Sequence, residues 1–215
     1  MEELTCFAKN VTKTYIIDTS FLIKSFEEGS EDYEICNTVR KFIFESEKIT
    51  AIYNTTIRAE LLKYVRKVLI TSFLNSNQNY FSQEIISIKK REKKLTVNNL
   101  INHGLIDVFS EAFGETGQFL VNQLNIITDG VIFYSPSQNT KRSKLWQLLP
   151  EIMAKFGLDS GDAMILNIAL STKGINGLIT ADREFRFCET GKNFDIFMPK
   201  RHITGSLKSW RKHGK

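Results

Sequence analysis

The stretch YIIDTSFLI, residues 15–23, runs from large apolar residues directly into a carboxylate, Asp18, followed by two hydroxyl residues. The apolar run that leads into Asp18 predicts a short buried strand over residues 14–18, and a helix is expected over residues 21–28. Burying a carboxylate without a partner costs a large amount of free energy. Asp18 therefore needs polar or charged neighbours from elsewhere in the chain.

Along the rest of the chain, short apolar runs alternate with segments whose apolar residues recur at helical spacing. The alternation predicts an α/β fold with a central, mainly parallel sheet and helices on both faces. In such sheets, ligands bind at the carboxyl ends of the strands, near a reversal in strand order, and Asp18 lies at such an end. Further strands are expected at 49–53, 125–135, 177–180 and 194–198, and helices at 33–47, after Thr56, at 139–156 with a break at Pro150, and at 159–174.

The length of 215 residues suits one α/β domain with an insertion. A helical insertion is expected at about 80–124, and a basic tail occupies about 199–215. The net charge of +5 permits a polyanionic partner without requiring one. The basic run KKREKK, residues 89–94, is interpreted as a solvated helix face, with phosphate contact as the alternative. The tail, which contains Trp210, either binds a single-stranded nucleic acid or is a loose terminus.

The three cysteines argue against a disulfide framework or a zinc knuckle, because they are odd in number and widely spaced. The polar N-terminal residues do not resemble a signal peptide, and no apolar run approaches the ~18 residues of a membrane span. A cytoplasmic protein without a membrane partner is expected. The three histidines stand in no catalytic motif, so a histidine-based mechanism is poorly supported.

Four acidic residues are predicted to meet at one edge of the sheet. Asp18 and Asp182 each follow a short strand, whereas Glu60 and Asp162 lie in the first turns of helices. Helix starts favour carboxylates because free N–H groups and the helix dipole face them. Each residue alone has an ordinary interpretation, such as a turn, a solvated residue or a partner for a nearby arginine. Their combined positions favour a shared site.

Such a cluster suits a divalent metal. Carboxylates within a few ångströms of each other repel, and some would protonate without a cation. Oxygen-only ligands of this kind favour Mg²⁺ or Mn²⁺. A metal-bound water can supply a hydroxide nucleophile, and the metal can stabilise charge in a phosphoryl transition state.

Four segments of the sequence resemble the acid-bearing motifs of PIN-domain ribonucleases, with VapC-type toxins as the nearest version. They are IIDTSFLI, TTIRAELL, GLDSGDAMILNIAL and GLITADREF. Mapped onto these motifs, Asp18, Glu60, Asp162 and Asp182 take the places of the catalytic, metal-binding acids. The resemblance covers roughly residues 14–196 but not the middle of the chain.

The resemblance implies an α/β/α sandwich and a single PIN-like domain over residues 1–215. It also implies cleavage of RNA that depends on Mg²⁺ or Mn²⁺. A toxin of this type would have a small antitoxin partner that blocks the acidic pocket, and such toxins often form homodimers. A PIN fold that holds RNA or a protein without cutting is the alternative function. A haloacid-dehalogenase-type phosphatase is disfavoured, because Ser20 stands where that family needs a second Asp.

Several polar residues beside the four acids have two interpretations. Thr19, Ser20 and Thr180 either orient carboxylates or bind phosphate, or they merely cap helix and strand ends. Asp159 lies three residues before Asp162, on the same helix face. It is either a fifth acid near the metal or the cap of the helix, with its carboxylate on the N–H of Asp162, and we favour the cap.

Overall fold

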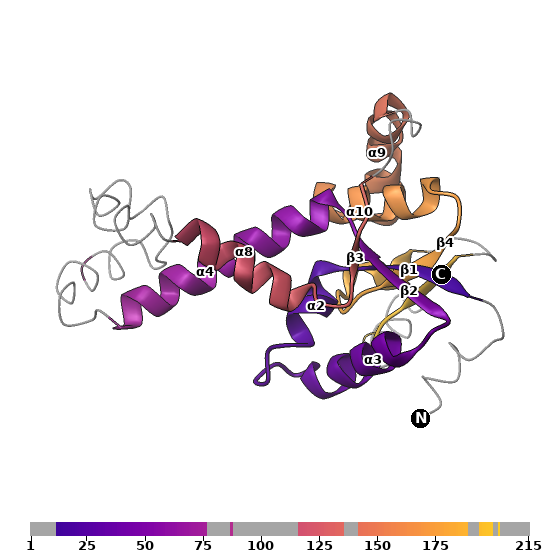
Figure 1. Cartoon of the computed structure of the whole chain (residues 1–215). Coiled ribbons are helices and arrows are strands. Elements are labelled where there is room, and N and C mark those ends of the chain that lie inside the picture. Colours follow the sequence, from indigo (N-terminus) through magenta and orange to yellow (C-terminus); the bar gives the residue numbers. More distant parts are fainter. Residues whose placement is uncertain are drawn as a thin grey trace, which may run out of the picture. The chain divides into compact units, whose positions relative to one another are not determined.

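The computed structural model describes residues 12–76, 87, 116–135, 142–188, 194–199 and 202. The run KKREKK, nearly all of the basic tail and most of the expected insertion lie outside these residues. The chain forms two compact units, one of Met1–Leu61 with Ile127–Lys215, and the other of Leu62–Ile126. The first unit holds the sheet, and the described part of the second consists mainly of two helical segments (Figure 1).

The first unit is built on a five-stranded sheet in which every pair of neighbouring strands is parallel. The strands lie in the order β3-β2-β1-β4-β5. The chain thus moves from β1 outward to β2 and β3, then returns to the other side of β1 for β4 and β5. Their bounds are Lys13–Ile17 (β1), Ile49–Tyr53 (β2), Ile132–Phe133 (β3), Ile175–Ile179 (β4) and Asp195–Phe197 (β5).

The central strand β1 lies at the heart of the core. Its last three residues, Tyr15, Ile16 and Ile17, are at most 1% exposed. Consecutive apolar residues suit a parallel strand that is covered on both faces, because its side chains alternate between two buried layers. The apolar run before Asp18 therefore makes β1 the middle of the sheet.

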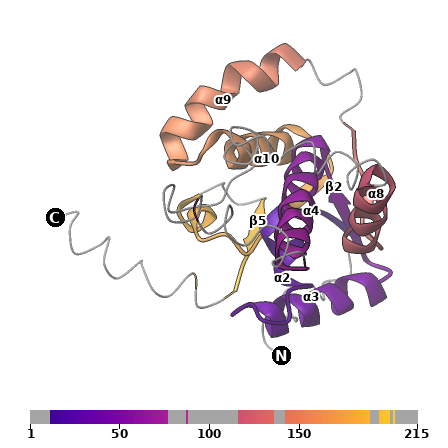
Figure 2. The ribbon, with the colours of Figure 1, turned by 90° about the vertical axis from the view of Figure 1, so that its left-hand side faces the viewer.

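Helices cover both faces of the sheet, which confirms the predicted α/β architecture. Helices α3 and α10 lie on opposite sides of the strands in two perpendicular views (Figures 1 and 2). Helix α9 packs on α10. The helices are α2 (Thr19–Lys24), α3 (Tyr33–Glu45), α4 (Thr55–Ser76), α8 (Thr116–Ile127), α9 (Arg142–Phe156) and α10 (Ser160–Ser171), with a 3₁₀ turn η1 (Glu184–Phe187). Among the described residues, no helix is both long enough and apolar enough to cross a membrane.

Three expected elements differ from the structure. The helix expected over residues 21–28 is wrong in its second half, because α2 begins at Thr19 and ends at Lys24. The expected strand at 125–135 is wrong in its first half, because α8 continues to Ile127 and only Ile132–Phe133 pair as a strand. Leu124 and Ile127 are buried at helical spacing, and Gly130, with φ of 76°, forms the turn that follows. The apolar residues of 125–135 alone did not distinguish the end of a helix from the start of a strand.

The expected break at Pro150 is also wrong, since α9 passes through this proline without ending. A proline inside a helix removes one backbone hydrogen bond. Packing on α10 offsets this loss. Leu145 and Leu149 are buried, and the side-chain amide of Asn167 in α10 donates to the Leu145 carbonyl at 2.6 Å. The helix ends instead at Gly157, as expected, with a φ of 68°.

Gly177→Ala should destabilise the fold, because β4 and β5 approach each other closely at this point. A Cβ on Gly177 would lie 2.2 Å from the backbone oxygen of Asp195. We expect a loss of about 2–3 kcal/mol in the free energy of unfolding, measured by urea denaturation. Gly29→Ala is the control, since a Cβ there meets nothing within 4 Å. Equal stability of the two variants would contradict the close approach.

Candidate acidic site at the carboxyl edge of the sheet

The strand order reverses between β1 and β4, and the candidate site lies where these two strands end. Asp18 directly follows β1, and its N–H donates to the carbonyl of Ile179, the last residue of β4, at 2.9 Å. Asp182 follows β4 by three residues. In open parallel sheets, the crevice at such a reversal is where ligands bind. The topology thus places two of the four predicted acids at this point.

Asp18 is 2% exposed, and its carboxylate accepts hydrogen bonds from a hydroxyl group in α2 and from one just after β4. Thr180 donates to Oδ2 at 2.7 Å, Ser20 Oγ donates to the same oxygen, and the Ser20 N–H lies 3.3 Å from it. The last contact makes Asp18 the N-cap of α2. Burial raises the pKa of Asp18, the two hydroxyl donors oppose this rise, and the nearby charge of Asp182 adds to it.

The same hydroxyl groups connect Asp18 to Asp182. Thr180 Oγ1 accepts the N–H of Asp182 at 2.9 Å, and Ser20 Oγ accepts the N–H of Ala181 at 3.0 Å. The Asp182 carboxylate in turn accepts the N–H of Glu184 at 2.8 Å. Ser20 and Thr180 thus hold the backbone after β4 against the buried carboxylate of Asp18.

Glu60 reaches the site from the start of α4. Thr19 Oγ1 donates to Glu60 Oε2. The other oxygen, Oε1, lies 2.8 Å from the position that a Cβ on Gly161 would occupy, in the first turn of α10. Glu60 therefore lies between the starts of α2 and α10. An alanine at position 161 would push this carboxylate away.

Asp162, in the first turn of α10, is half-buried and lies in the field of the other acids. Burial raises its pKa to about 8, and the charges of Asp18, Asp182, Asp159 and Glu60 contribute to this rise. Burial and like charges disfavour the ionised form of a carboxyl group, and groups shifted in this way are enriched at functional sites. All four predicted acids thus share one electrostatic site.

Asp159 caps α10, which confirms the favoured interpretation of this residue. Its carboxylate accepts the N–H of Asp162 at 2.9 Å. The hydrogen bond fixes the start of α10 and, through it, the position of Asp162. Asp159 also contributes negative charge to the raised pKa of Asp162.

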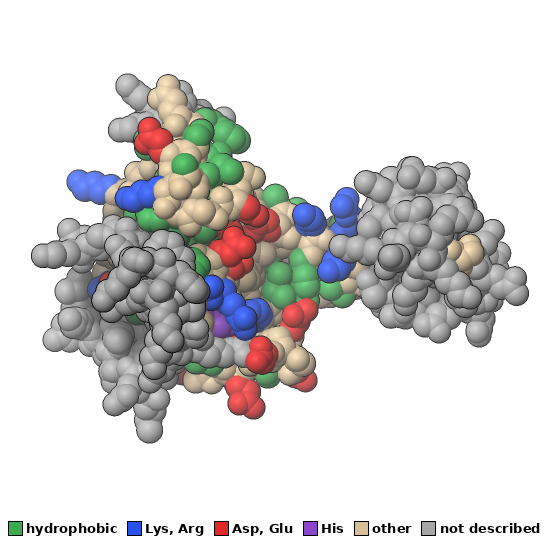
Figure 3. Space-filling view, turned by 180° about the vertical axis from the view of Figure 1, so that it is seen from behind, with side chains coloured by type: hydrophobic (Ala, Val, Ile, Leu, Met, Phe, Trp, Pro, Cys, Tyr) green, Lys and Arg blue, Asp and Glu red, His purple; other side chains and the backbone are tan. Residues whose placement is uncertain are grey.

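Three of the four acids have no ion-pair partner in the described part of the chain. Asp18, Asp162 and Asp182 form no ion pair with any described lysine, arginine or histidine. Figure 3 shows acidic side chains gathered on one face of the molecule, with basic side chains beside them. Carboxylate oxygens are hard donors of the kind that a divalent cation such as Mg²⁺ or Mn²⁺ prefers.

The described residues do not, however, form a complete cage of ligands. No three of their His, Cys, Asp or Glu side chains converge closely enough to hold an ion. Mg²⁺ does not need such a cage, because it keeps several waters and commonly takes only one or two carboxylates together with substrate phosphate. The chemistry of the site fits this cation, and the arrangement leaves its coordination to water and substrate.

Two residues near the site were not found from the sequence. The Cys188 thiol has a pKa raised to about 12, by burial and by the nearby charge of Asp162. Lys24 Nζ donates to the carbonyl of Ala181 at 3.1 Å and to the buried carboxylate of Asp32 at 2.9 Å. Lys24 ends α2, the helix that Asp18 caps, and Cys188 directly follows η1, but neither residue lies in a motif that marks it.

Comparisons with known proteins do not assign the chain to a family. No family model matches the sequence, and no curated protein matches it. Among solved structures, the chain is similar to a chain of VapBC2 from Rickettsia felis, crystallised with a DNA fragment from its promoter. The identity is 13%, the match covers 86% of this chain and 98% of the other, and the TM-score is 0.43. This likeness is too low to assign a family or an activity.

The raised pKa of Asp162 should make the metal-free protein less stable as the pH rises. Between the unfolded pKa of ~3.9 and the folded value of about 8, the folded state holds a proton that the unfolded state has lost. Stability should therefore fall from pH 5 to pH 8. In Asp162→Asn, the loss in the free energy of unfolding between pH 5 and pH 8 should be smaller by about 1–2 kcal/mol. The difference is modest because solvent reaches the group.

Urea denaturation in EDTA at a series of pH values measures this effect. Asp195→Asn is the matched control, because it removes an exposed carboxylate from the start of β5, away from the carboxyl edge. An identical pH slope in wild type and Asp162→Asn would contradict the electrostatic coupling of the site.

Proposed function

We propose that this chain is a metal-dependent endoribonuclease that hydrolyses RNA phosphodiester bonds with Mg²⁺ or Mn²⁺. The observation that carries the proposal is that four carboxylates, from four separate segments, lie within electrostatic reach of one another near the strand-order reversal of a parallel sheet. Like charges gathered at this edge disfavour the ionised forms of the acids, and a bound cation would offset that electrostatic cost.

Asp18, Asp162, Asp182 and Glu60 are the candidate ligands, and one or two of them would hold the metal together with water and substrate phosphate. When bound, the metal would supply a hydroxide nucleophile near neutral pH and stabilise negative charge on the phosphoryl group. This donor set consists only of carboxylate oxygens, which matches the preference of Mg²⁺ and Mn²⁺.

The remaining residues of the site keep the carboxylates in place. Thr180 and Ser20 fix the orientation of the buried Asp18 carboxylate, and Thr19 holds Glu60. The cap made by Asp159 fixes the start of α10 and hence Asp162. Hydroxyl and backbone partners of this kind orient metal ligands, and their loss commonly lowers activity or metal affinity by about 10–100-fold.

RNA is the substrate that the sequence motifs favour. The four acid-bearing segments resemble those of PIN-domain ribonucleases in order, spacing and position on strands and helices. The net charge of +5 suits a polyanionic substrate. By the same resemblance, we propose a cytoplasmic toxin of a toxin–antitoxin pair, with a small antitoxin protein and a second copy of the chain as partners.

Cleavage of RNA tests this proposal directly. Purified protein is incubated with a labelled RNA of mixed sequence in Mg²⁺, in Mn²⁺ and in EDTA. We expect cleavage only with metal, and a loss of more than about 100-fold in Asp18→Asn and Asp182→Asn. Asp182→Asn complements Asp18→Asn because Asp182 is not fully buried, so its change should disturb folding less.

Glu45→Gln is the control, since Glu45 is exposed at the end of α3, shortly before β2 begins, and so lies toward the opposite edge of the sheet. It should cleave like wild type. RNA that binds equally to all variants but stays intact would favour a non-catalytic RNA-binding module. Cleavage that persists in EDTA and in both acid variants would contradict the proposal.

A further inference from the structure

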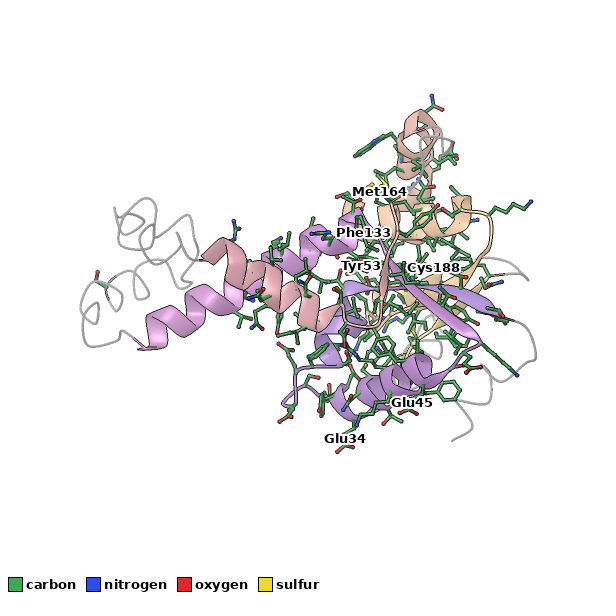
Figure 4. The ribbon with its side chains drawn as sticks, in the orientation of Figure 1. Glu34, Glu45, Tyr53, Phe133, Met164 and Cys188 are labelled. Carbon is green, nitrogen blue, oxygen red and sulfur yellow. The ribbon has the colours of Figure 1, made fainter. Side chains whose placement is uncertain are left out.

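An exposed aromatic ring with an arginine over it lies at the end of the edge strand β3. Phe133 is 41% exposed. Its ring centre lies 5.2 Å from that of Tyr53 on the neighbouring strand, and the Arg58 guanidinium lies 5.3 Å from the Phe133 ring centre. Tyr53, in contrast, is 6% exposed. Figure 4 shows Phe133 and Tyr53 side by side at this edge of the sheet.

This aromatic pair lies on the same edge of the sheet as the four acids. Tyr53 and Phe133 are the last residues of β2 and β3, and they are partners in the parallel register. The carboxyl ends of parallel strands lie along one edge, so this pair and Asp18 occupy neighbouring positions on it. Tyr53 stands between Phe133 and the end of β1 in the strand order.

Helix α4 connects the two features. Ile57 and Leu61 are fully buried and define the side of the helix that faces the core. At 100° per residue, Arg58 and Glu60 flank this buried stripe on opposite sides. Glu60 faces Thr19 and Gly161, and Arg58 faces Phe133. The ring and the acids are therefore separated by about one helix width, ~10 Å.

The position of Arg58 is not explained by an ion pair within the described residues. Arg40 provides the contrast. Its guanidinium lies over Phe26 and Phe44, is buried, and donates to Ser25 Oγ and to the Asp129 carbonyl. Arg40 thus has a structural role, whereas Arg58 presents a positive charge beside an exposed ring.

We propose that Phe133 and Arg58 form a stacking site for a base of single-stranded RNA whose backbone passes the acidic site. This inference rests on the proposed function and adds how the substrate is held. Every base has an apolar face that stacks on an aromatic ring, and an adjacent arginine supplies a planar cation and attracts the backbone. Bases inside a duplex are already stacked, so the site selects single strands over duplexes.

Binding without cleavage tests the proposal. A fluorescein-labelled 12-nucleotide single-stranded RNA of mixed sequence is titrated with protein in EDTA and followed by anisotropy. Phe133→Leu keeps apolar bulk but removes the aromatic face, and it should weaken binding by about 5–100-fold. Phe133→Trp should bind at least as well as wild type. Arg58→Gln should also weaken binding and should lower its dependence on salt.

Phe44→Leu is the matched control. Phe44 resembles Phe133 in exposure and in having an arginine beside its ring. It is 38% exposed, and the Arg40 guanidinium lies 4.8 Å from its ring centre. It lies in the last turn of α3, before β2 begins, and so belongs to the opposite edge of the sheet. Its change should leave RNA binding unaltered. Thermal unfolding of each variant shows whether the fold is intact.

An RNA that lacks some of its bases tests whether Phe133 contacts a base. The same 12-mer with several abasic positions should bind wild type more weakly, and Phe133→Leu should cause no further loss with it. Equal affinity of wild type and folded Phe133→Leu for the normal RNA would overturn the stacking site and leave the acid-dependent cleavage untouched. The wild-type protein could instead self-associate, with Phe133→Leu abolishing the self-association and leaving RNA binding unchanged. That result would overturn the stacking site and indicate that a second copy of the chain docks on Ile132 and Phe133.

Discussion

The buried carboxylate of Asp18 is the constraint on which the arrangement of the site depends. It ends the central strand, at the point where the strand order reverses, and it is satisfied by hydroxyl groups on both sides of that reversal. Ser20 and Thr180 thereby join the start of α2 to the end of β4. Replacing either hydroxyl would leave the carboxylate short of a donor, which costs about 1–3 kcal/mol in a buried position. The need to satisfy one charge thus fixes the position of two chain segments.

The rest of the acidic site follows from that junction. Asp182 is held by the same threonine that donates to Asp18, and Glu60 is held by Thr19, the residue next to Asp18. Asp162 stands at the start of α10, with its pKa raised to about 8 by burial and by the surrounding acids. The fold thus gathers like charges where a cation and a phosphate would balance them. Under the proposed function, the site would give up some stability for catalysis, as functional sites commonly do.

Much of this site could be predicted from the sequence, because carboxylates after strands and at helix starts have few structural uses in combination. Strands around Ile16, Ile52 and Leu178 were predictable from uninterrupted apolar runs. The end of α8 and the passage of α9 through Pro150 were not, since tertiary packing decides both. Phe133 was indistinguishable from a core residue in sequence, because its exposure depends on β3 being an edge strand. Lys24 and Cys188 lie six residues after Asp18 and Asp182 respectively, but no motif in the sequence marks either of them.

The central claim is that the four acids form one cation-binding centre. Electron paramagnetic resonance of Mn²⁺ titrated into wild type and into Asp162→Asn measures this without any substrate. The account predicts saturable binding of Mn²⁺ to wild type, weakened about tenfold or more in Asp162→Asn. Equal binding to the two proteins, or no saturable binding to wild type, would contradict it.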